Sequence, residues 1–195
     1  RCARLVVLLF PIVFLLLLAI ALWLILMGLV AWYGSRVTPV WFDPAQRAPH
    51  DFNDPATVAR FYQALNRIMP LQNHAGPLFI RFVQPGCPCE QFVDNYHQLM
   101  QPLLRQQGFR VMSLDPLQMG QLEALLGPVL WQWIPATPAI LVLDSQHQVA
   151  YFGPYHQAGI CNSENSYLEP VLKALASQQP VNIINTLVEG CFCHY

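Results

Sequence analysis

The stretch PLFIRFVQPGCPC, residues 77–89, decides the architecture expected for this chain. Its first half is a short apolar run, which is typical of a strand buried in a sheet. The run ends at Pro85-Gly86, and Cys87-Pro88-Cys89 follows at once. From Cys89 to about residue 104 apolar residues recur with helical spacing, so the cysteines are expected at a helix N-terminus, with Pro102 kinking or ending that helix. Free N–H groups and the helix dipole stabilise a thiolate there, which makes these cysteines candidate nucleophiles.

Further elements flank this stretch in an alternating order. Before it, Asp54-Pro55 provides an N-cap and a first-turn proline for an amphipathic helix. After it we expect a strand at 109–114, a helix from Asp115-Pro116 to Gly127-Pro128, a hairpin of residues 138–143 and 148–152, and a last helix opened by a Ser166-x-x-Glu169 capping box. Parallel strands joined through helices, followed by an antiparallel hairpin, predict an α/β sandwich with a mixed sheet.

The N-terminal end is far more apolar than the rest of the chain. Residues 5–33 contain no charged residue, and a helix of this length exceeds a hydrocarbon core of about 30 Å. The run is too long for a cleaved signal peptide, so one retained transmembrane helix is expected. Arg1 and Arg4 precede the span and Trp32 and Tyr33 end it. This favours an N-terminus inside, in the inner (cytoplasmic) membrane, with the C-terminal domain on the extracytoplasmic or periplasmic side.

The pattern divides the chain into four parts. We expect a transmembrane anchor at 1–34, a Pro-rich linker at 35–53, a folded domain at 54–180 and a cysteine-containing tail at 181–195. The net charge is −1, and the ten Lys and Arg residues form no basic cluster, which argues against nucleic acid as a partner. No HExxH, GxSxG or Walker A pattern occurs, so the enzyme classes that use them have no local support.

Cys2 lies in the N-terminal part of the chain. The other five cysteines belong to the part expected outside the membrane: Cys87, Cys89, Cys161, Cys191 and Cys193. Disulfides persist in an oxidising compartment, and an odd number suggests a free thiol or an exchanging pair. A bond between Cys87 and Cys89 would close a small, easily reduced ring. The Cys191-Phe192-Cys193 pair has two interpretations. It could fold back and exchange with Cys87 and Cys89, or one tail cysteine could be bonded to Cys161 as a staple.

Three features together resemble the thioredoxin-like superfamily over approximately residues 54–178. They are Gly86-Cys87-Pro88-Cys89 after a first core strand, Thr137-Pro138 directly before another core strand, and the order of the elements. The resemblance implies thiol-disulfide exchange with protein thiols and no cofactor. It also implies that Cys87 is the exposed attacking thiol, Cys89 the resolving thiol and Pro138 the contact for the partner's sulfur. One residue, instead of the family's two, separates the cysteines, and the reverse assignment of Cys87 and Cys89 stays open.

Two other classes of function compete with exchange. Cys87, Cys89, Cys191 and Cys193 offer soft thiolates for Cu(I) or Zn(II), so a metal-binding or metallochaperone module is one alternative. A redox-inert interaction domain that keeps only the fold is the other. Five histidines show no shared spacing and are expected on solvated surfaces: His50, His74, His97, His147 and His156. The function that the residues favour is a membrane-tethered thiol-disulfide oxidoreductase.

Overall fold

The computed structural model describes residues 2–34, 39–47, 50–71, 76–156 and 166–195. The chain divides into two compact units, residues 1–38 and 39–195, and each is described by itself. His74 and Cys161 lie outside the described residues.

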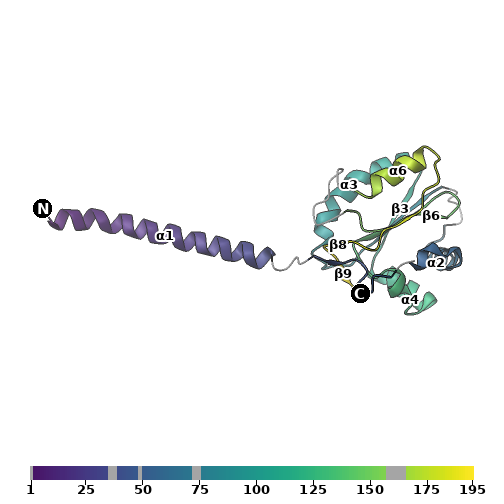
Figure 1. Cartoon of the computed structure of the whole chain (residues 1–195), viewed down its shortest axis with the longest axis horizontal. Helices are drawn as coiled ribbons and strands as arrows, with labels where there is room; N and C mark the ends of the chain where they lie inside the picture. Colours follow the sequence, from purple (N-terminus) through teal and green to yellow (C-terminus); the bar gives the residue numbers. More distant parts are fainter. Residues whose placement is uncertain (1, 35–38, 48–49, 72–75, 157–165) are drawn as a thin grey trace. The chain divides into compact units, whose positions relative to one another are not determined.

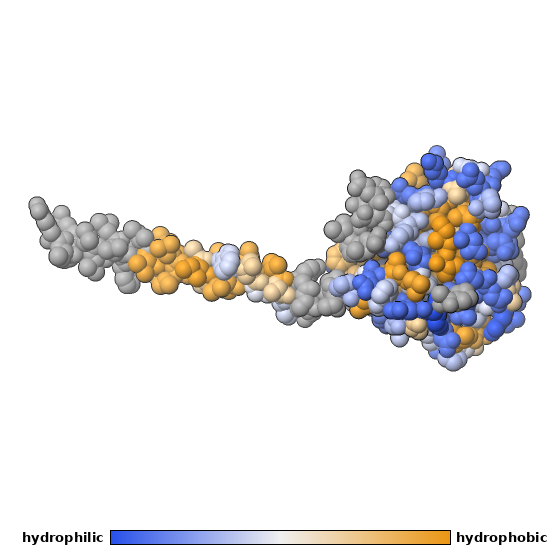
Figure 2. Space-filling view, in the orientation of Figure 1, coloured by the Kyte–Doolittle hydropathy of each residue, from blue (hydrophilic) through white to orange (hydrophobic). Residues whose placement is uncertain are grey.

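The first unit holds helix α1, Cys2–Gly34 (Figure 1). Its section Val13–Trp32 has a mean hydropathy of 3.0 and exposed side chains. Figure 2 shows this section as a predominantly apolar surface. By length and composition the helix can cross a membrane. The predicted N-terminal apolar helix is therefore present, while its orientation and the choice of membrane stay predictions.

The second unit is built on a five-stranded mixed sheet. The strands are β2 (Leu78–Phe82), β3 (Arg110–Leu114), β5 (Ala139–Leu143), β6 (Val149–Gly153) and β7 (Ile183–Ile184), in the spatial order β3-β2-β5-β6-β7. The pairs β2–β3 and β6–β7 are parallel, whereas β2–β5 and β5–β6 are antiparallel. The predicted α/β class with a mixed sheet is confirmed.

Helices cover both faces of this sheet (Figure 1). Helices α2 (Pro55–Ile68) and α4 (Pro116–Leu126) pack on one face, and α3 (Glu90–Gln106) and α6 (Leu168–Ala176) on the other. Side chains of β2 alternate between the two cores, because successive residues of a strand point to opposite faces. Leu78, Ile80 and Phe82 belong to the first core and Phe79 to the second. Arg81 is on the same face as Phe79, and this alternation directs a guanidinium toward α3.

Local capping signals fix the N-termini of α2 and α4. The Asp54 side chain accepts from the N–H groups of Ala56 and Thr57, and Asp115 forms a capping box with Gln118. The capping box predicted at Ser166 and Glu169 is wrong. Helix α6 begins only at Leu168, whose N–H donates to Ser166 Oγ, so Ser166 lies too far upstream to pair with Glu169 as a cap.

Pro102 lies inside α3, and the helix continues to Gln106. The proline ring is exposed, while Met100 and Leu104 on either side are buried in the core. Burial of these neighbours holds the helix together where the proline removes one backbone hydrogen bond.

The segments expected as linker and tail take part in the second unit. Strand β1 (Val40–Trp41) pairs with β8 (Glu189–Gly190), and both Phe42 and Phe52 are buried in the first core. Phe52 belongs to a short 3-10 helix, Asp51–Asn53. The compact unit therefore begins at residue 39 and runs to residue 195, so its boundaries differ from the expected 54–180.

Candidate functional site

Cys87 and Cys89 lie in the turn between β2 and α3. The turn is tight, because the Cys87 N–H donates to the Gln84 carbonyl and the Glu90 N–H donates to the Cys87 carbonyl. Gly86 adopts a φ of 84°, which glycine tolerates without strain. Cys89 directly precedes the first residue of α3, so the cysteines lie at a helix N-terminus as the sequence predicts.

The C-terminal segment 189–195 covers these cysteines. Strand β9 (Cys193–His194) pairs antiparallel with β4 (Ala136–Thr137), with Thr137 opposite Cys193. On the other side β8 pairs with β1, and His194 Nε2 donates to the Trp41 carbonyl at 2.8 Å. The segment is thus held by two short ladders as well as by its sulfurs.

Two disulfides join the segment to the turn. Cys87 is bonded to Cys193 and Cys89 to Cys191. The two Cys-x-Cys pairs therefore run antiparallel, and the first cysteine of each pair is bonded to the second cysteine of the other. Cys87 and Cys89 are therefore not bonded to each other. Nor is Cys87 exposed as the resemblance implies, because Cys87 and Cys89 are only 6% and 4% exposed. The expected small ring is absent here because the neighbouring strand brings two further sulfurs to the turn.

The sulfurs form one cluster. The Sγ atoms of Cys87, Cys89 and Cys193 all lie within 4.8 Å of one another, and Cys191 is bonded to Cys89. A thiolate released from one disulfide would therefore lie close to a sulfur of the other. Thiol-disulfide exchange proceeds through such an attack, so the two disulfides are placed to exchange with each other.

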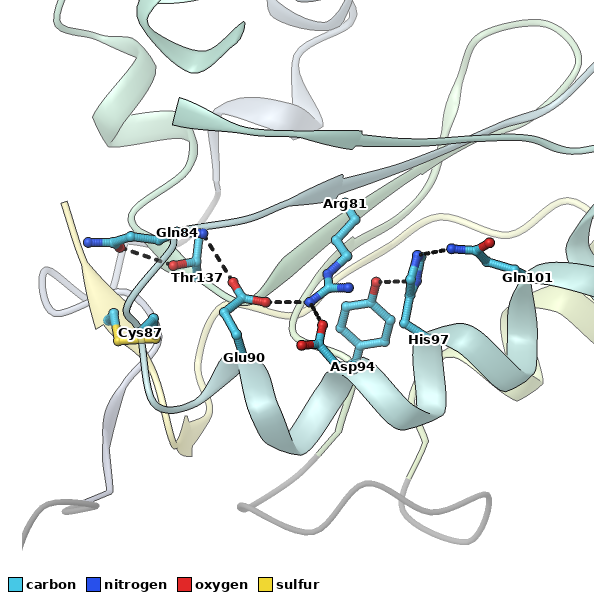
Figure 3. A network of polar contacts seen from close by, with 10 residues as sticks. Arg81, Gln84, Cys87, Glu90, Asp94, His97, Gln101 and Thr137 are labelled. Carbon is cyan, nitrogen blue, oxygen red and sulfur yellow. Dashed lines mark hydrogen bonds and ion pairs between the residues drawn. A yellow bond between two sulfur atoms is a disulfide. The ribbon is translucent and has the colours of Figure 1, made fainter. Parts of the chain in front are cut away.

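Polar side chains connect the cysteine turn to the sheet (Figure 3). Glu90 Oε2 accepts from Arg81 Nη2 at 2.5 Å, and Glu90 Oε1 accepts from the Gln84 N–H at 3.2 Å. The same Arg81 nitrogen donates to Asp94, and the Thr137 hydroxyl donates to Gln84 Oε1. The network therefore ties the turn both to β2 and to the strand that carries the C-terminal segment.

Glu90 is the buried acid of this network, with a side chain 9% exposed. Burial raises the pKa of Glu90, although the hydrogen bond and charge of Arg81 and the Gln84 N–H act in the opposite direction. The side chain of Asp94, the other acid bonded to Arg81, is half exposed. Arg81 is thus the main compensation for the buried charge of Glu90.

A cavity of about 30 Å³ lies beside the Cys89–Cys191 bond and is lined by both cysteines, Pro138, His156 and Phe192 among others. The Thr137–Pro138 peptide bond is cis, and Pro138 and Cys89 both line this cavity. The role of Pro138 as a contact for a partner's sulfur stays a prediction. His156 is 6% exposed, and neither of its ring nitrogens has a hydrogen-bond partner among the residues that the structure describes.

The expectation that the histidines are solvated is wrong for three of them. His50, His97 and His156 are buried, because aromatic neighbours rather than water surround their rings. His97 is paired with Tyr155 and Gln101. Burial lowers the pKa of each of the three to about 4. The folded protein keeps all three rings neutral at pH 7.

Replacing His156 by Phe is expected to weaken the acid sensitivity of the fold. The unfolded chain takes up a proton on this ring below about pH 6.5, whereas the folded chain does so only near pH 4, so His156 destabilises the fold progressively as the pH falls through this window. Between pH 7.5 and 5.5 we expect the variant to lose about 1 kcal/mol less stability than the parent. Chemical denaturation of the full chain in detergent measures this difference.

His156→Gln is the matched control, because glutamine removes the titration and keeps a polar side chain. Both variants should show the same reduced pH dependence. A pH dependence equal to that of the parent chain in His156→Phe would contradict a neutral, buried imidazole.

The sequence reasoning missed Arg81, Glu90 and His156 as members of the site. One signal was available for Arg81, which is the single charge inside the apolar run 77–83. A charge in such a run requires a buried partner, and Glu90 at the start of the next helix supplies it. No pattern in the sequence places His156 beside the cysteines.

These features define a class: an α/β unit with a mixed sheet, preceded by an apolar helix and closed by a double disulfide. The chain belongs to the family described as a domain of unknown function (DUF6436), whose model matches residues 58–195. The match includes the four disulfide-bonded cysteines. No curated protein matches the chain.

Two solved structures are similar to this chain. A hypothetical protein from Sinorhizobium meliloti 1021 is 15% identical, with a TM-score of 0.46, over 62% of this chain and 79% of that chain. An uncharacterized conserved protein from Geobacillus kaustophilus is 16% identical, with a TM-score of 0.45, over 62% of this chain and 76% of that chain.

Proposed function

We propose that the protein is a membrane-tethered, thioredoxin-like thiol-disulfide oxidoreductase that acts on protein thiols on the extracytoplasmic side of the inner membrane. One observation carries the proposal. Each cysteine of the turn at the N-terminus of α3 is bonded to a cysteine of the C-terminal segment 189–195, which lies against the turn. This arrangement is an isomer of two separate disulfides, Cys87–Cys89 and Cys191–Cys193, and thiol-disulfide exchange is the reaction that interconverts such pairings.

The first step follows from the accessibility of the sulfurs. Cys193 is partly exposed, whereas Cys87 is buried. A partner thiolate therefore attacks Cys193 Sγ, the Cys87–Cys193 bond breaks, and Cys87 leaves as a thiolate. The position of Cys87 beside the N-terminus of α3 stabilises this leaving group. A second partner thiolate then attacks the partner's sulfur in the mixed disulfide and releases Cys193 as a thiolate. The partner dithiol is oxidised to a disulfide, and Cys87 and Cys193 are reduced.

The sulfur cluster supplies the next step. The Cys87 thiolate, within 4.8 Å of Cys89 Sγ, attacks the Cys89–Cys191 bond, and Cys191 leaves as a thiolate. The products are a Cys87–Cys89 disulfide and a reduced C-terminal segment. The pair that the resemblance identifies as catalytic then holds the disulfide, and the same steps in reverse reduce a partner.

Substoichiometric reduction of the full chain in detergent tests this sequence of steps. We mix the oxidised chain with less than one equivalent of a peptide dithiol, alkylate the free thiols and map disulfides by mass spectrometry. The expected products are oxidised peptide, a Cys87–Cys89 disulfide, and alkylated Cys191 and Cys193. The chain used carries Cys2→Ala and Cys161→Ala, so that only the four cysteines of the two disulfides are alkylated and mapped. A chain that leaves the peptide reduced, even at excess peptide, would overturn the proposal.

Soft-metal binding is the second candidate, since the three clustered sulfurs are placed within reach of a single ion once the disulfides are reduced. Cys87, Cys89, Cys191 and Cys193 would then supply thiolates to Cu(I) or Zn(II). Titration of the reduced chain with Cu(I) under anaerobic conditions tests it. A stoichiometric complex that is lost with alanine at Cys191 and Cys193 would favour this function, and absence of a complex would exclude it.

A further inference from the structure

We infer that the partner of this site is a protein that presents a Cys-x-Cys dithiol on an extended segment, with a small residue before it and an apolar residue between its cysteines. The inference rests on the proposed function and names its substrate class. The C-terminal segment 189–195 is the pattern for that partner, because it shows what the surface around Cys87 and Cys89 accepts.

The spacing of the partner's cysteines follows from strand geometry. Successive side chains of an extended segment point to opposite faces, so cysteines two residues apart point to the same face. Cys191 lies at a bend between β8 and β9, and Cys193 lies in β9; both are bonded to the turn, and Phe192 between them packs against Phe42 of the first core, with ring centroids 5.2 Å apart. A Cys-x-x-Cys segment aligned on Cys191 would place its second cysteine at the position of His194, which follows Cys193 in β9 and therefore points away from the turn, toward the Trp41 carbonyl.

The backbone of the partner has a strand to pair with. Strand β4 offers its edge to β9, and no other strand among the described residues pairs with β4. Backbone hydrogen bonds of this kind do not depend on side chains, so the edge accepts any extended segment once residues 193–194 leave it. The side chains of the partner are then selected by bonding to Cys87 and Cys89 and by the space that Phe192 occupies.

The residues around the cysteines of the segment add two requirements. Phe192 lines the cavity beside Cys89 and is partly buried, which favours an apolar or aromatic residue at the middle position. A Cβ on Gly190 would lie 2.8 Å from the tip of the Phe192 ring, which would have to shift, so a small residue is favoured before the first cysteine. The recognised pattern is therefore small–Cys–apolar–Cys.

Peptide capture by the full chain tests this inference. Serine replaces Cys191 and Cys193, so that Cys87 and Cys89 are free to bond an added peptide, and serine also replaces Cys2 and Cys161. The chain in detergent is mixed with Gly-Cys-Phe-Cys-His and two equivalents of oxidised glutathione. Two protein thiols and two peptide thiols then give two interchain disulfides, and the glutathione is reduced to four thiols. Mass spectrometry measures the doubly linked adduct.

Matched peptides separate the requirements. Relative to Gly-Cys-Phe-Cys-His, we expect about tenfold less doubly linked adduct with Gly-Cys-Phe-Ser-Cys-His, which has the longer spacing, and about tenfold less with Gly-Cys-Ser-Cys-His, which lacks the ring. Leu-Cys-Phe-Cys-His, which has a large residue before the first cysteine, should also give less adduct. Equal amounts from all four dithiols would overturn the inference and leave the proposed function standing. If no peptide and no small dithiol exchanges with Cys87 or Cys89, the proposed function fails as well.

Discussion

Alanine at all four clustered cysteines is expected to lower the free energy of unfolding by about 7 kcal/mol, whereas loss of either disulfide alone is expected to cost about 2 kcal/mol. The reason is that the two bonds close nearly the same loop. Their sequence separations are 106 and 102 residues, and either bond alone holds the C-terminal segment to the turn. With one bond present, the other closes a ring of only about six residues. Closing so small a ring removes much less entropy from the unfolded chain than closing the long loop does.

Three variants measure this non-additivity: Cys87→Ala with Cys193→Ala, Cys89→Ala with Cys191→Ala, and the four substitutions combined. Denaturant unfolding of the full chain in detergent gives each free energy. The sum of the two pairwise losses should fall well short of the combined loss. Simple additivity would mean that the bonds close independent loops, contrary to their arrangement in the structure.

The central elements of the fold could be predicted from the sequence because each has a local cause. The apolar run 77–83 forms β2, the cysteines precede α3, and Asp54 and Asp115 cap the helices that follow them. Apolar periodicity and capping act over a few residues, so a single sequence reveals them.

The site could be predicted only in part, because its assembly depends on contacts between distant residues. Five cysteines allow many pairings, and nothing local selects Cys193 for Cys87. Strands β4, β8 and β9 have two residues each, too few to show a period. The position of the tail depends on Phe192 reaching the first core and on β4 being free to pair. Both are tertiary contacts between residues far apart in the sequence, and they hold the C-terminal segment over the cysteine turn.

Replacing Arg81 by Met is expected to destabilise the protein by about 3–5 kcal/mol at pH 8, the cost of leaving a buried acid without its partner. Arg81 and Glu90 have side chains only 7% and 9% exposed, and methionine fills most of the volume of arginine without its charge. Burial already raises the pKa of Glu90, and Arg81 opposes that rise. Without Arg81 the pKa of Glu90 rises further, so the carboxyl group takes up its proton at a higher pH.

The pH dependence identifies the cause of this loss. When the folded-state pKa of Glu90 is above its unfolded value, the folded chain binds the extra proton, and stability falls as the pH rises between the two values. The destabilisation by Arg81→Met, relative to the parent chain at the same pH, should therefore be smaller at pH 5.5 than at pH 8. Adding Glu90→Gln to Arg81→Met should recover much of the loss, because no buried charge is left.

Asp94→Asn is the matched control, and we expect it to cost less than about 1 kcal/mol, since a half-exposed partner in an ion pair contributes little. A loss in Arg81→Met that is independent of pH and is not recovered by Glu90→Gln would assign Arg81 a packing role instead. In that case the connection from the cysteine turn to β2 would depend on the volume of the side chain and not on its charge.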